Sequence, residues 1–132
     1  MAQTPVTLIR NLQRRNARRR QPLAIVEGVR LTEEALGAEL SFKGAAVSPA
    51  LGRSERGVAL LDDLRHAGVS IEEVDDHALS DLADTDTPQG IVAVVEPPEW
   101  RVADLSVGVG ESILVLDGVQ DPGNVGALLR TA

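Results

Sequence analysis

Residues 91–95 read Ile91-Val92-Ala93-Val94-Val95, and this run is the strongest strand signal in the chain. A short, uninterrupted apolar run bounded by turn residues is typical of a strand that is buried on both faces. Such a strand needs neighbouring strands at its sides and helices above and below it. The run therefore predicts a sheet that is covered on both faces.

The residues before this run alternate between helix and strand patterns. Helices are expected over residues 5–19, 29–37, 55–67 and from Asp75 or Asp76 to Leu82 or Ala83. Thr4 is the expected N-cap of the first helix, with Pro5 at its first position. Strands are expected over residues 23–26, 45–48 and 69–74. The resulting order, α and then β-α-β-α-β-α-β, predicts a mostly parallel or mixed sheet with helices on both faces.

The residues after the run predict a second, incomplete unit. Consecutive prolines at 97 and 98 favour an extended linker, which we place over residues 97–110. A strand is expected over Ile113–Leu116, then a glycine-containing loop, then a helix from near Asn124 to Ala132. We therefore expect a first domain over residues 1–96 and the start of another over residues 111–132.

Composition narrows the classes of function. The chain has 132 residues, of which 43% are apolar, and this is enough for one globular domain. It has no cysteine, which excludes disulfides and thiolate metal sites and suits a cytoplasmic protein. With only His66 and His77, a histidine metal cluster is not expected. No apolar stretch approaches the roughly 20 residues needed to cross a bilayer, so no membrane partner is expected.

Charge is distributed unevenly along the chain. Residues 1–20 hold six arginines and no acid, whereas the rest of the chain holds seven basic residues against all 20 acidic ones. This asymmetry points to a polyanionic partner, and arginine forms bidentate contacts with phosphate. The residues expected to bind RNA are Arg14, Arg15, Arg18, Arg19 and Arg20. An organellar transit peptide and a solvated helix face are the alternative interpretations of this segment.

Aromatic side chains are too few for a base-stacking surface, since Phe42 and Trp100 are the only two. Recognition of RNA shape and phosphates by arginine fits the composition better.

Two sets of residues carry a family resemblance. The string from Leu116 to Gly126, followed by Leu129-Arg130-Thr131-Ala132, resembles the first signature motif of the SpoU (TrmH-type) RNA 2′-O-ribose methyltransferases of the knotted SPOUT superfamily. Its glycine spacing fits neither G-x-G-x-x-G nor the Walker A loop. The basic segment 14–20, the turn Val26-Glu27-Gly28 and the string from Thr85 to Ile91 resemble the N-terminal substrate-binding domain of the same enzymes.

The resemblance implies both a fold and a function. The expected fold is an α/β three-layer sandwich resembling kink-turn-binding ribosomal proteins, followed by the truncated start of a knotted SPOUT α/β domain. The implied function is RNA recognition within an S-adenosylmethionine-dependent RNA 2′-O-ribose methyltransferase, with ribosomal RNA preferred over transfer RNA as substrate. The alternatives are a non-catalytic RNA-binding module of the kink-turn-binder type and a protein-interaction domain whose basic helix docks on an acidic partner.

The resemblance also implies roles for two residues, Asn124 and Arg130, as candidate catalytic residues. In the family, the arginine at the position of Arg130 is assigned to the ribose hydroxyl. A guanidinium stays protonated, so holding a phosphate and stabilising developing negative charge is the easier role. Asn124 would organise the loop, or would simply cap the helix. The alternative for Arg130 is an exposed charge at a helix end.

In the family, the motifs that bind the methyl donor follow the first signature motif, and they are absent from residues 1–132. We therefore expect this chain alone to be inactive, to bind no S-adenosylmethionine and to be a monomer. The parent enzyme is expected to form a homodimer through the domain that is missing here.

Overall fold

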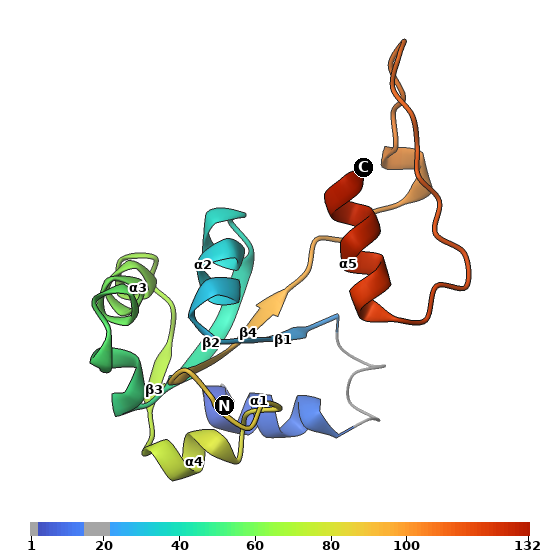
Figure 1. Ribbon diagram of the computed structural model, residues 1–132. Coiled ribbons are helices and arrows are strands. Elements are labelled where there is room, and N and C mark those ends of the chain that lie inside the picture. The colour runs from blue at the N-terminus through green and yellow to red at the C-terminus, as the bar shows by residue number, and fades with distance from the viewer. Residues whose placement is uncertain (1–2, 15–21) are drawn as a thin grey trace. The chain divides into compact units, whose positions relative to one another are not determined.

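The computed structural model describes residues 3–14 and 22–132, and the chain divides into two compact units, Met1–Pro98 and Glu99–Ala132. The first unit contains the elements α1 (Pro5–Gln13), β1 (Ala24–Glu27), α2 (Val29–Gly37), β2 (Ser41–Val47), the 3₁₀ helix η1 (Pro49–Arg53), α3 (Glu55–His66), β3 (Ile71–Glu73), α4 (Asp76–Ser80) and β4 (Ile91–Glu96) (Figure 1). The predicted alternation of helices and strands is confirmed.

The four strands form one mixed sheet in the order β1-β4-β2-β3. Strand β4 pairs antiparallel with both β1 and β2, whereas β2 and β3 pair in parallel. The apolar run of the sequence thus lies inside the sheet, with Ala93 opposite Val26 on one side and opposite Ala45 on the other.

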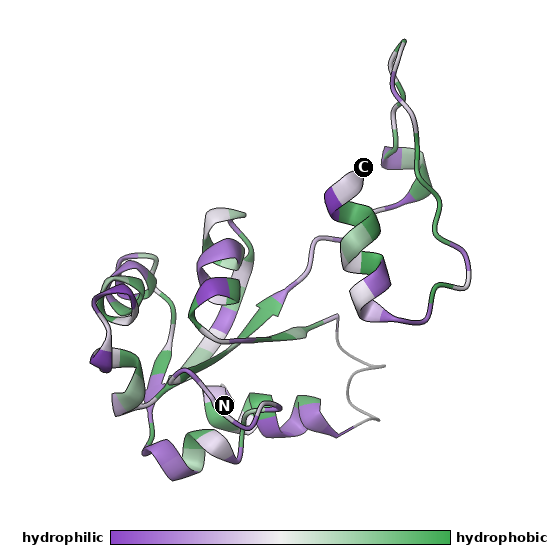
Figure 2. Cartoon of the chain, viewed as in Figure 1, coloured by the Kyte–Doolittle hydropathy of each residue, from purple (hydrophilic) through white to green (hydrophobic). Residues whose placement is uncertain are grey.

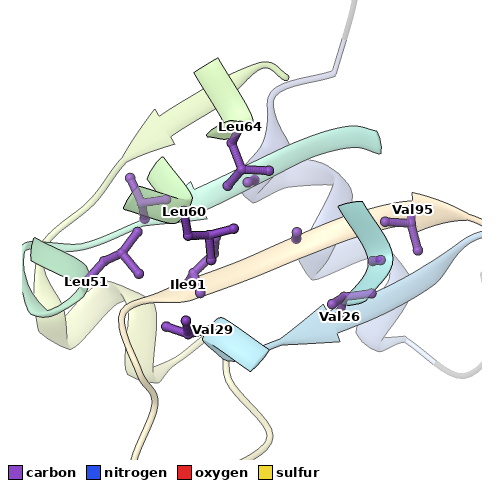
Figure 3. Packing of buried hydrophobic residues seen from close by; sticks show 11 residues of the cluster. Val26, Val29, Leu51, Leu60, Leu64, Ile91 and Val95 are labelled. Atoms are coloured by element: carbon purple, nitrogen blue, oxygen red, sulfur yellow. The ribbon is translucent and has the colours of Figure 1, made fainter. Parts of the chain in front are cut away.

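Side chains of β4 point alternately into two hydrophobic cores, because successive residues of a strand face opposite sides of the sheet. Ile91, Ala93 and Val95 pack against α2 and α3, in a cluster that also holds Leu60 and Leu64 (Figure 3). Val92 and Val94 join the second cluster, whose helix residues are Leu8, Ile9, Leu12 and Leu79. Helices α2 and α3 therefore cover one face and α1 and α4 the other, which gives the three layers of the predicted sandwich (Figure 1). In Figure 2 the strand β4 is hydrophobic, whereas the helices carry hydrophilic residues between their apolar ones.

Helix α1 begins as predicted and ends earlier. The Thr4 side chain accepts a hydrogen bond from the Thr7 N–H, with Pro5 in the first turn. The helix ends at Gln13 rather than at residue 19, since Arg14 is extended with φ −75° and ψ 118°. Short helices depend on packing of an apolar face, and Leu12 is the last apolar side chain before a polar, arginine-rich segment. Residues 15–19 of the predicted helix lie outside the described residues.

The second unit contains the 3₁₀ helix η2 (Val102–Asp104) and helix α5 (Pro122–Thr131). The strand expected over Ile113–Leu116 is absent from this unit, and Ile113 and Leu114 are half exposed. The prediction was wrong because a strand needs a partner for its backbone groups, and residues 99–132 supply none. No residue of this unit is buried.

Helix α5 begins two residues before the predicted start. Asp121 is its N-cap, and its carboxylate accepts hydrogen bonds from the N–H groups of Gly123 and Asn124 at 2.6 and 3.1 Å. The capping role considered for Asn124 is therefore filled by Asp121.

Candidate nucleic-acid interface

Two strings that resemble the substrate-binding domain are joined in the structure, although 57 to 60 residues separate them. The Glu27 carboxylate accepts hydrogen bonds from the Asp84 N–H at 2.8 Å and from the Thr85 hydroxyl. The side-chain oxygen of Gln89 accepts the Val29 N–H at 3.0 Å. These contacts hold the loop before β4 against the turn between β1 and α2.

Two glycines allow these loops to approach closely. Gly28 has φ +88°, and Gly90 has φ +85°, a backbone region that other residues rarely adopt. A Cβ at Gly90 would lie only 2.2 Å from the Leu51 backbone nitrogen. Figure 3 shows Val29, Leu51 and Ile91 gathered at this end of the sheet. The strings around Gly28 and Gly90 thus build a packed corner of the sandwich.

Helix α1 is fixed to the sandwich at both ends. The Val6 N–H donates to the Glu72 carboxylate at 2.9 Å, and the Gln13 side-chain amide donates to the Leu82 carbonyl at 2.9 Å. Leu8, Ile9 and Leu12 are buried between these two contacts. The arginine-rich segment therefore starts from a defined point of the sandwich, because Gln13 directly precedes Arg14.

Of the residues expected to bind RNA, only Arg14 is described. It is exposed, and it lies at the C-terminal end of α1. Arg15, Arg18, Arg19 and Arg20 lie outside the described residues.

The basic residues in the body of the first unit are neutralised by acidic neighbours. All five between residues 22 and 98 form ion pairs, namely Arg30 with Glu34, Lys43 with Glu96, Arg53 with Asp76, Arg56 with Glu33, and Arg65 with Asp62 and Glu73. The pair between Glu33 and Arg56 is bidentate, since the Glu33 carboxylate accepts hydrogen bonds from both Nε and Nη2 of Arg56. The hydrogen bond from Arg56 lowers the pKa of Glu33 below its ordinary value of 4.5. These paired side chains offer little free positive charge to a polyanion.

The candidate catalytic residues Asn124 and Arg130 both lie on α5, and both are exposed. Six residues separate them, which places their side chains on different sides of a helix with about 3.6 residues per turn. The guanidinium of Arg130 lies over its own helix, since a Cβ at Gly126 would be 3.3 Å from Arg130 Nη1. Within the described part of the chain, the structure does not bring these two residues together.

Metal and membrane sites are absent from the described residues. No group of three or more histidine, aspartate or glutamate side chains there could hold a metal ion. His66 contacts the Asp62 carbonyl on its own helix, and His77 lies 3.7 Å from Asp81. Among the same residues, no helix has the length and apolar character needed to span a bilayer.

The structural roles of Glu72, Gln13 and Asp121 were not predicted from the sequence. Their roles depend on which backbone groups lie opposite them after folding. Only Asp121 carried a local signal, as an acidic residue directly before a proline.

Comparison with known proteins identifies relatives of this chain. The family model described as "MRM3-like substrate binding domain" matches residues 4–93. The 23S rRNA (guanosine(2553)-2′-O)-methyltransferase RlmP of Bacillus subtilis is 34% identical over 108 residues, which are 82% of this chain and 38% of that protein. The 23S rRNA (guanosine-2′-O-)-methyltransferase RlmB of Pasteurella multocida is 42% identical over 78 residues, covering 55% of this chain and 32% of that protein.

A solved structure has a similar fold. The AdoMet-bound rRNA methyltransferase from Sinorhizobium meliloti matches with a TM-score of 0.73 and 27% identity, over 96% of this chain and 46% of that one. The chain thus spans less than half the length of each of these relatives.

Proposed function

Because the chain belongs to the family of MRM3-like substrate binding domains, we propose that it is the RNA-recognition part of a ribosomal RNA 2′-O-ribose methyltransferase. The match over residues 4–93 carries this proposal, since it covers the sandwich from the N-cap of α1 into β4. The homologues are rRNA 2′-O-methyltransferases, and the two named relatives act on guanosines of 23S rRNA.

The arginine-rich segment supports a phosphate-binding role within this function. It follows a helix that is anchored at both ends, and it holds Arg14, Arg15, Arg18, Arg19 and Arg20 with no acid among them. The acidic body of the sandwich repels RNA from other surfaces, so contact is directed to one side. We place the enzyme in the cytoplasm, in agreement with a chain that lacks cysteine.

We propose that residues 111–132 are the start of the catalytic domain, with 97–110 as linker. Methyl transfer to a ribose requires that the hydroxyl lose its proton and that the methyl donor lie in line with it. A guanidinium cannot take that proton at neutral pH. Arg130 would instead hold a phosphate and stabilise negative charge on the oxygen, and Asn124 would order the loop.

S-adenosylmethionine is the methyl donor that we propose for the whole enzyme, supported by the AdoMet-bound relative. Residues 99–132 do not fit the donor by themselves, because none of them is buried. We therefore propose that this chain alone is a monomer without transferase activity, and that the whole enzyme forms a homodimer through its catalytic domain.

A non-catalytic RNA-binding module of the kink-turn-binder type is the second candidate. It is supported by the position of the core, since all buried residues lie in the first unit. A module of this kind would fold and bind RNA without residues 99–132, whereas the methyltransferase needs the rest of its catalytic domain.

Competition binding tests the proposed function. The chain is titrated into labelled, refolded fragments of 23S ribosomal RNA, and transfer RNA or duplex DNA of equal phosphate concentration is then added. We expect the chain to bind the labelled RNA, and unlabelled ribosomal RNA to displace it more effectively than duplex DNA does. Absence of binding at low salt, or equal competition by duplex DNA, would contradict the proposal.

A further inference from the structure

Helix α1 has an outer face that is polar and exposed. Thr7 and Arg10 lie three residues apart on one side of the helix, and Arg14, which is also exposed, is the residue that directly follows the last turn. Leu8, Ile9 and Leu12 occupy the opposite side and are buried. We call Thr7, Arg10 and Arg14 the α1 outer face.

The two arginines of the α1 outer face differ from the basic residues of the body. Within residues 3–14 and 22–132, neither Arg10 nor Arg14 has an acidic partner within ion-pair distance. The five basic residues between 22 and 98 are all paired, as is Arg101. Residues 1–20 contain no acid at all. The guanidinium donors of Arg10 and Arg14 are therefore available to an external anion.

The anchoring of α1 gives this face a fixed orientation. The contacts of Val6 with Glu72 and of Gln13 with Leu82 hold both helix ends. Arg10 lies in the last turn of this anchored helix, and Arg14 directly follows Gln13, so both positive charges start from backbone that is held against the sandwich. An arginine on an anchored helix loses less conformational entropy on binding than an arginine on a flexible chain does.

The chemistry of the face suits the backbone of a nucleic acid rather than its bases. Residues 3–14 include no aromatic side chain that could stack on a base. Arginine contacts with phosphate give affinity and register without reading sequence.

We propose that the α1 outer face binds the phosphate backbone of RNA, and that Arg10 is a contact additional to the arginines of residues 14–20. This inference rests on the proposed function. The competing explanation for Arg10 is purely structural, because a cation in the last turn of a helix interacts favourably with the helix dipole.

The test compares Arg10→Gln with Arg30→Gln in the full 132-residue chain. Arg30 is the matched control, since it is an exposed helical arginine of equal charge that is paired with Glu34. Affinity for refolded 23S ribosomal RNA fragments is measured across a salt series, and thermal unfolding is measured for each protein. We expect Arg10→Gln to reduce the slope of log K against log salt by roughly 0.7–0.9, and Arg30→Gln to leave it unchanged. Arg10→Lys should retain the slope, because it keeps the charge.

Several results would overturn the inference. Equal salt-dependence slopes for Arg10→Gln and Arg30→Gln would show that RNA binding responds to the net charge of the chain and not to a contact at Arg10. A lower melting temperature of Arg10→Gln with an unchanged slope would show that Arg10 stabilises the C-terminal end of α1 and does not contact RNA. Displacement of RNA by an equal charge of polyglutamate would point to an acidic protein partner. RNA binding that depends on residues 14–20 but not on Arg10 overturns this inference alone, whereas no binding by the unmodified chain contradicts the proposed function as well.

Discussion

The side-chain oxygen of Gln89 lies 3.0 Å from the backbone nitrogen of Val29, across 60 residues of sequence. Gln89 thereby satisfies one of the N–H groups that the first turn of α2 leaves without a partner in its own helix. Gly28, the N-cap of that helix, has no side chain to do so. The string from Thr85 to Ile91 thus completes the helix that begins after Val26-Glu27-Gly28.

Replacing Gln89 should therefore destabilise the sandwich. Gln89→Leu leaves the Val29 N–H without its acceptor, and we expect a loss of about 1 kcal/mol in the free energy of unfolding. Urea denaturation measures this loss, with Gln120→Leu in the exposed loop of the second unit as control. Equal stability of the two variants would show that the contact contributes nothing.

Gly90→Ala should be more damaging than Gly37→Ala. The substitution places a Cβ 2.2 Å from the Leu51 nitrogen in a backbone conformation with φ +85°, so backbone must shift. We expect a loss of more than about 1 kcal/mol. Gly37→Ala, where a Cβ would meet nothing within 4 Å, should be neutral or stabilising in the same thermal unfolding assay. Similar melting temperatures for the two variants would contradict the close packing of Gly90 against the Leu51 backbone.

The sequence predicted the sandwich well because its signals are local. The apolar run at 91–95 identified the inner strand, and Gly37 and Gly68 marked the ends of α2 and α3. The failures have a common physical origin, since they depend on partners distant in sequence. Strand β2 begins at Ser41 rather than Ala45, since Ser41 and Phe42 pair with Glu96 and Val95. Ile113–Leu116 has strand composition but no neighbour to pair with. The ion pairs that distinguish the basic residues between 22 and 98 from Arg10 and Arg14 could not be predicted from the sequence.

Acid should weaken the link between α2 and α3. The Arg56 hydrogen bond lowers the pKa of Glu33 below 4.5, so the folded state favours the ionised carboxylate. The resulting stabilisation is present above pH 4.5 and disappears as the pH falls through the lowered pKa. Glu33→Gln should therefore be less stable than the unmodified chain at pH 7, and the difference should shrink toward pH 3. Urea unfolding at both pH values tests this, and a difference independent of pH would contradict it. Arg56→Gln should give the same pattern, because it removes the same pair.

Binding of the methyl donor should be absent from this chain alone. No residue of the second unit is buried, so titration calorimetry with S-adenosylmethionine should give no binding heat beyond dilution. Tight binding would show that residues 99–132 form a donor site without the rest of the catalytic domain. Residues 1–98 serve as the control, since they hold the whole buried core.

We propose that this sandwich recognises RNA through phosphate contacts from its arginine-rich segment. The most direct measurement is the salt dependence of binding to refolded 23S ribosomal RNA fragments, with the unmodified chain beside a variant in which Arg14, Arg15, Arg18, Arg19 and Arg20 are alanine. Each phosphate contact adds roughly 0.7–0.9 to the slope of log K against log salt. We predict a steep slope for the unmodified chain and a much shallower one, with much weaker binding, for the variant. Equal slopes and affinities in the two proteins would contradict the claim.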